Sequence, residues 1–128
     1  MRFIPCSASK FIPASHENPQ DPGVLKKVLA TKETLRDGKV QMINWARLPV
    51  GRGFQAHYHE DMQEVFIIIT GHAEMAIADE SFPATTGDTV IVDPGEVHTM
   101  RNVGETEVIY LVIGITSEDG GQTVVVNG

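Results

Sequence analysis

The chain has a single cysteine, Cys6, among its 128 residues. No intrachain disulfide can therefore form, and the cysteine content does not indicate an oxidising compartment. Basic residues are also few, since 10 Lys and Arg stand against 17 Asp and Glu and give a formal net charge of −7. Nucleic acids and anionic membrane surfaces bind clustered basic side chains, so this charge balance argues against both kinds of partner.

Long hydrophobic runs are missing as well. The strongest apolar stretches, residues 65–69 and 108–113, are far shorter than the roughly 20 residues that cross a bilayer as a helix. The first ten residues contain Pro5 and have no apolar run of the kind found in signal peptides. We therefore expect a soluble cytoplasmic protein, and its length fits one domain.

Helical periodicity of useful length is also lacking, and the pattern instead predicts strands. Residues 1–23 contain four of the seven prolines, which favours an extended arm. From residue 24 onward, short runs of β-branched and apolar residues alternate with Gly and Pro turns, as is typical of an all-β sandwich or barrel. We expect an arm at 1–23 and a β-barrel domain at 24–128. The predicted strands are residues 24–31, 39–48, 54–58, 64–70, 73–78, 89–93, 98–102, 107–115 and 123–126.

Four polar residues in these strands form a candidate metal site. His57 and His59 are two residues apart, so both side chains point to the same side of a strand. Glu64 begins the next predicted strand and His98 begins a third, so a rolled sheet would direct all four inward. A buried carboxylate beside three imidazoles would be costly without a cation. This donor set suits a divalent transition metal: iron, manganese, nickel, zinc, cobalt or copper.

The same region resembles the paired signature of the cupin superfamily. The sequence departs from that signature at one position, where Asp93 stands in place of the usual proline and Pro94 follows it. The departure affects a turn and leaves every candidate ligand in place. The positions that match are His57, His59, Glu64, His98, Gly51, Gly71, Gly87, Gly95 and Asn102.

The resemblance implies a fold and a metal content. The fold would be a double-stranded β-helix, also called a jelly-roll or cupin barrel, with the metal inside. The four candidate residues would bind one divalent transition metal per chain, and single-domain cupins commonly form homodimers.

Three functions are consistent with this site. Four protein ligands on an octahedral ion leave two neighbouring positions open. A metal-dependent dioxygenase would use them for a small enolisable or anionic substrate and for dioxygen, with Glu64 as a catalytic base. A redox-neutral isomerase, decarboxylase or cyclase would need only the substrate. A non-catalytic cupin would bind a small-molecule ligand without turnover.

Strand alternation also predicts the substrate pocket. Residues at even spacing from Glu64 and His98 should share their inward face and line the cavity; these are Phe66, Ile68 and Met100. Trp45 and Arg47 share one face of the predicted strand 39–48 and are further pocket candidates, with Arg47 as a clamp for a carboxylate. An exposed Arg47 and a Trp45 in the core stay open as alternatives. His16 and His72 are expected on the surface.

Overall fold

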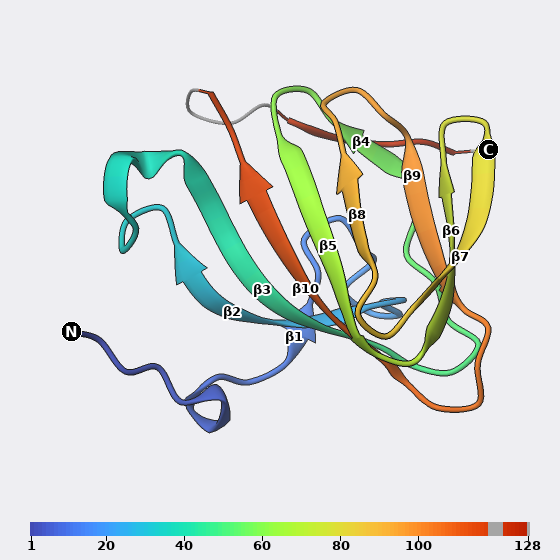
Figure 1. Ribbon diagram of the computed structural model, residues 1–128, viewed down its shortest axis with the longest axis horizontal. Coiled ribbons are helices and arrows are strands. Elements are labelled where there is room, and N and C mark those ends of the chain that lie inside the picture. The colour runs from blue at the N-terminus through green and yellow to red at the C-terminus, as the bar shows by residue number, and fades with distance from the viewer. Residues whose placement is uncertain (118–121, 128) are drawn as a thin grey trace.

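The computed structural model describes residues 1–117 and 122–127, and its strands form two antiparallel sheets that face each other (Figure 1). The strand order is β1-β2-β3-β10-β5-β8 in the six-stranded sheet and β11-β4-β9-β6-β7 in the five-stranded sheet. The predicted all-β jelly-roll fold is confirmed. Residues 118–121 and 128 of the predicted domain 24–128 lie outside the described residues.

Each sheet combines strands from distant parts of the chain. The six-stranded sheet contains β1 (Ile12–Pro13), β2 (Leu25–Thr31), β3 (Val40–Leu48), β10 (Val108–Ile115), β5 (Gln63–Thr70) and β8 (Thr89–Val92). The five-stranded sheet contains β11 (Thr123–Val125), β4 (His57–His59), β9 (His98–Asn102), β6 (His72–Ile77) and β7 (Glu80–Thr85). Two short 3₁₀ turns, Cys6–Ala8 and Arg36–Gly38, precede β1 and β3.

The core lies between the sheets because each long strand buries alternate residues. In β3 the buried positions begin at Asn44, and in β5 they begin at Glu64. Apolar side chains fill most of the remaining interior. The largest fully buried side chains are Leu48, Ile68, Met75, Met100, His57, His98, Val24, Val92 and Val108. Two histidines in this set show that the interior also contains a polar site.

The chain passes from one sheet to the other at Gly71, between β5 and β6. This residue has a φ of 105°, which side chains with a Cβ rarely adopt. A Cβ at this position would also lie 2.9 Å from the Glu107 carbonyl oxygen and from the Val108 Cα. Both the turn and the close contact with the chain before β10 therefore require glycine.

Three strands differ from the sequence prediction. The prediction omitted β1 and β7, and β4 is limited to three residues where 54–58 had been expected. The polar residues of β7 and its Pro83 hid that strand. Because β7 lies at an edge of its sheet, a proline there breaks no central hydrogen-bond ladder.

Candidate metal centre

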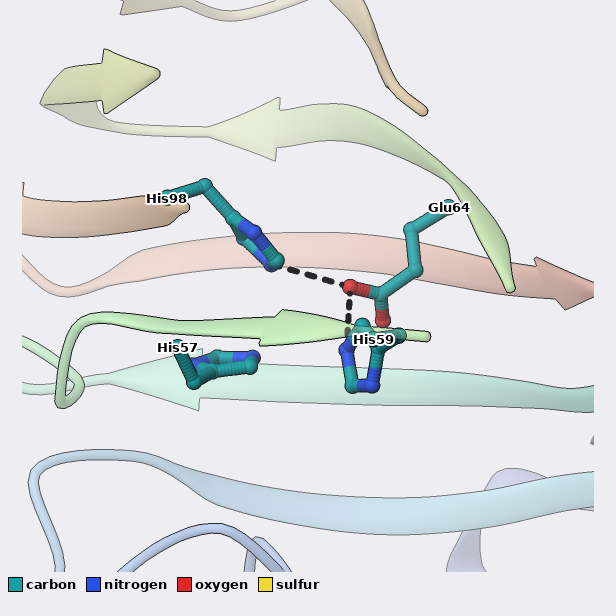
Figure 2. Close-up of side chains that lie close together, drawn as sticks. All are labelled: His57, His59, Glu64 and His98. Atoms are coloured by element: carbon teal, nitrogen blue, oxygen red, sulfur yellow. Dashed lines mark hydrogen bonds and ion pairs between the residues drawn. The ribbon is translucent and has the colours of Figure 1, made fainter. Parts of the chain in front are cut away.

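The four predicted ligands meet in the interior between the sheets. His57 and His59 are both buried, whereas Tyr58 between them is half-buried. β9 lies beside β4 with His98 directly opposite His57. Glu64 comes from β5 in the other sheet. One potential ligand atom from each of these four residues lies within 4.8 Å of the others, so the cluster could hold a metal ion (Figure 2).

A protein oxygen lies within hydrogen-bond distance of the outer nitrogen of each imidazole. The Nδ1 atom of His57 lies 2.6 Å from the Gln55 carbonyl oxygen, and that of His98 lies 3.0 Å from the Glu96 carbonyl oxygen. A carbonyl can only accept, so both Nδ1 atoms donate. The Nδ1 atom of His59 lies 2.8 Å from the Thr123 hydroxyl on β11. In a neutral imidazole whose Nδ1 donates, Nε2 has a free lone pair, which is the form that binds a metal.

The inner nitrogens face a shared acceptor. Glu64 Oε1 lies 3.0 Å from His98 Nε2 and 2.9 Å from His59 Nε2. The contact with His59 lacks hydrogen-bond geometry, so this buried nitrogen has no hydrogen-bond partner among the described residues. Lone pairs and a carboxylate at these distances repel unless a proton or metal ion lies between them. The residues present therefore fit a divalent cation.

Burial and charge keep the cluster ready to bind a cation. Burial, together with the nearby His16 and His98, lowers the pKa of His57 to about 3, so its imidazole is neutral at pH 7. Burial alone would raise the pKa of Glu64, but His59 and His98 offset that effect and hold it at about 2. The carboxylate is therefore ionised, as metal binding requires.

A cavity of about 200 Å³ opens beside the cluster. Its walls include Phe66 and Val112 together with polar side chains, among them Asn44 and Lys26 from β3 and β2. Burial lowers the pKa of Lys26 from its ordinary value. Drug-sized ligands usually occupy cavities of about 300–1,000 Å³, so this one suits a small metabolite.

The cavity contains only part of the predicted pocket. Phe66 lines it, whereas Ile68 and Met100 are buried in the core outside its lining. Trp45 and Arg47 were assigned to the wrong side of β3. The residues of that strand that face the cavity are Asn44 and Ala46, and Arg47 forms an exposed ion pair with Glu107.

The N-terminal arm adds a residue that the sequence did not reveal. His16 was expected on the surface, but its ring stacks on His57 at a centroid distance of 4.1 Å and lines the cavity. Its Nδ1 lies 3.0 Å from Glu17 Oε2, and Glu17 also accepts hydrogen bonds from the backbone nitrogens of Gly23 and Gln55. A Cβ on Gly23 would lie 1.8 Å from the Gly53 carbonyl oxygen, so only glycine fits there. These contacts depend on distant segments, and no local sequence signal predicts them.

Comparison with known proteins agrees with this geometry. Residues 44–114 match the family model of the cupin domain, which covers more than half of the chain. The chain belongs to the cupin family. Within the described residues of this cupin, no helix is long and apolar enough to cross a membrane.

Two matches to this cupin, one by sequence and one by structure, have names that refer to oxalate. It is 28% identical over 85 residues to the oxalate-binding protein of Thermotoga maritima, a match that covers 66% of this chain and 69% of that protein. The crystal structure of a predicted oxalate decarboxylase from Thermotoga maritima is similar, with a TM-score of 0.80 and 25% identity. That match covers 90% of this chain and 99% of the other.

A third similarity concerns the fold alone. The polyketide cyclase RemF from Streptomyces resistomycificus has a TM-score of 0.81 at 13% identity, covering 100% of this chain and 87% of the other. Proteins with this fold therefore have several different functions, and the function of this cupin must be argued from its own site.

Proposed function

We propose that this cupin binds one divalent transition metal per chain through His57, His59, Glu64 and His98, and that the metal holds a small carboxylate ligand. The observation that supports this most directly is the contact of the Glu64 carboxylate with two imidazole nitrogens at 2.9 and 3.0 Å in a buried cluster. When bound, the ion would act as a Lewis acid toward the ligand. Iron, manganese, nickel, zinc, cobalt and copper all suit these donors.

The charges at the site support a carboxylate ligand. A divalent ion keeps about one positive charge after binding a single carboxylate, and it would attract an anion. Lys26 lies in the wall of the same cavity and adds a second positive charge. The relatives named for oxalate agree with this ligand class.

Oxalate should bind to the manganese-loaded protein and not to the metal-free protein. Isothermal titration calorimetry before and after treatment with a chelator would measure the difference, which we expect to exceed 100-fold in affinity because the ion provides the main contact. Equal affinity with and without metal would contradict the proposed function.

Turnover is a separate step of the proposal. The dioxygenase would consume oxygen when iron-loaded, whereas a redox-neutral isomerase, decarboxylase or cyclase would turn over anaerobically. The names of the relatives favour decarboxylation or binding without turnover. The low pKa of Glu64 favours a ligand role for this residue over a role as general base, since an effective base has a pKa near the working pH. Oxygen-electrode and product assays, run once in air and once under anaerobic conditions, would separate these alternatives.

We also propose a cytoplasmic homodimer. The single cysteine agrees with that location, and the outer face of the six-stranded sheet supports a dimer. There Trp45, Leu111 and Ile67 lie opposite one another across three strands. A second row extends to Ile91, which is 57% exposed. An apolar surface of this extent favours association.

Light scattering should give a mass of about twice the 14.0 kDa of one chain. Leu111→Arg, at the centre of the first row, should produce monomers because it places an unpaired charge in the contact. Val103→Arg, at an exposed loop position, is the matched control and should remain dimeric. A monomeric unchanged protein at micromolar concentration would contradict the proposal.

A further inference from the structure

Two polar side chains of the cavity wall have ligand-binding groups without partners in the part of the chain that the structure describes. Asn44 is only 5% exposed, yet its Oδ1 has no hydrogen-bond partner among the described residues. Lys26 is half-buried and forms no ion pair with any described residue, although it lines the same cavity. A buried polar atom and a partly buried ammonium group without partners both cost free energy. A ligand that paired with both would recover that cost.

The register of the six-stranded sheet places these two groups on the same inner face as Glu64, on a diagonal that leads away from the candidate metal cluster. Glu64, Asn44 and Lys26 belong to three successive inward-facing rows, each two residues further along the strands. Two residues span about 7 Å along a strand, so Asn44 lies about 7 Å and Lys26 about 14 Å further along the sheet than Glu64, and they lie two and three strands away from it. The rows are Glu64–Gly114–Met42, then Phe66–Val112–Asn44, then Tyr110–Ala46–Lys26.

The chemistry of each position indicates part of a ligand. The metal would take one carboxylate at the first row. The amide of Asn44 offers an acceptor and a donor, which suit a hydroxyl group. The Lys26 ammonium suits a second carboxylate. Oxalate has two carbons and no hydroxyl, so it can occupy the metal but has no group for Asn44 and is too short to reach Lys26 as well.

We infer that Asn44 and Lys26 recognise the far end of an extended hydroxy-dicarboxylate of about four carbons whose near carboxylate binds the metal. This inference rests on the proposed function, because it extends the same site away from the ion. The cavity of about 200 Å³ is large enough for such an acid and small enough to exclude much larger ones.

The test uses three probes that differ in length and in the hydroxyl group. Calorimetry on the manganese-loaded protein would measure oxalate, succinate and malate. Lys26→Met should weaken malate and succinate by roughly 10- to 100-fold and leave oxalate unchanged, because only the longer acids reach the ammonium group. Asn44→Leu should weaken malate by roughly 3- to 10-fold and leave succinate and oxalate unchanged.

Two controls separate binding from folding. Lys27→Met changes the next residue of β2, whose side chain faces Phe11 and the arm, and it should leave all three affinities unchanged. Asn44→Leu removes a buried polar group of similar size, so its thermal unfolding midpoint should rise while its affinity for malate falls. A fall in both the unfolding midpoint and the affinity for malate would show that Asn44 stabilises the fold, and it would overturn the proposed contact of Asn44 with the ligand.

The outcomes for the inference and for the proposed function differ. Two results would overturn the inference and leave the proposed function standing. One is that oxalate binds and malate binds no more tightly; the other is that Lys26→Met changes the affinities for oxalate and malate equally. Failure of all three acids to bind the metal-loaded protein would overturn both.

Discussion

Replacing His57 and His98 together by alanine should reduce the metal content from about one divalent ion per chain to none. The two imidazoles lie directly opposite each other on β4 and β9, and their loss leaves only His59 and Glu64 as ligands. Even changes to residues that merely support metal ligands lower affinity 10- to 100-fold, so losing two ligands should cost more than about 100-fold. Elemental analysis after gel filtration would measure the bound ion.

His72→Ala is the matched control for this double substitution. His72 is exposed at the start of β6 and its ring contacts Thr85, so the variant should keep its ion. Glu64→Gln keeps the size of the side chain and one oxygen but loses the charge, and it should give an intermediate affinity. Circular dichroism would confirm that each variant is folded. Full metal content in the double variant would contradict the assignment of the centre.

The candidate metal cluster could be predicted in part because strand alternation is a local rule. Alternation places His57 and His59 on one side of a strand whatever surrounds it. The other two residues belong to strands that adjoin glycine turns, with Gly71 directly after β5 and Gly95 before β9, both in the left-handed region. Short-range signals therefore indicated an all-β fold and the four residues of the cluster, whereas the resemblance to the cupins was needed to predict the jelly-roll fold.

The pocket could not be predicted in the same way, because β3 has apolar residues on both faces. Trp45 is large and aromatic and suggested a pocket wall, but it lies on the outer face in line with Leu111. The inward position next to it is Ala46, whose small side chain leaves room for the cavity. Hydrophobicity identifies the inner face of a strand only when the outer face is polar.

The arm posed a different difficulty. Its prolines favour an extended segment, and the 3₁₀ turn Cys6–Ala8 and β1 are both short. Its location depends on Glu17, which accepts hydrogen bonds from Gly23 and from Gln55, 38 residues away. A single glutamate in a proline-rich segment reads as an exposed residue, because its partners are backbone nitrogens that have no sequence signature.

Glu17→Ala should therefore cause the largest loss of stability among single substitutions in the arm. The Glu17 side chain is only 3% exposed, and its removal leaves the backbone N–H groups of Gly23 and Gln55 without their acceptor. Leaving the buried Gly23 N–H unpaired costs about 1–3 kcal/mol, and the part-buried Gln55 N–H adds less, so unfolding should become easier by roughly 1–4 kcal/mol. In a domain of this size the melting temperature should fall by about 5–15 °C, as calorimetry would measure.

Two further variants locate this effect in the arm. Glu105→Ala removes an exposed glutamate and should melt within about 2 °C of the unchanged protein. Glu17→Gln keeps one carbonyl acceptor, so its melting temperature should lie between those of Glu17→Ala and the unchanged protein. Hydrogen exchange at the Gly23 and Gln55 amides should accelerate more than exchange in β10, because the arm opens while the central strands stay paired. Equal acceleration in β10, or an unchanged melting temperature for Glu17→Ala, would show that Glu17 does not hold the arm and His16 at the metal centre.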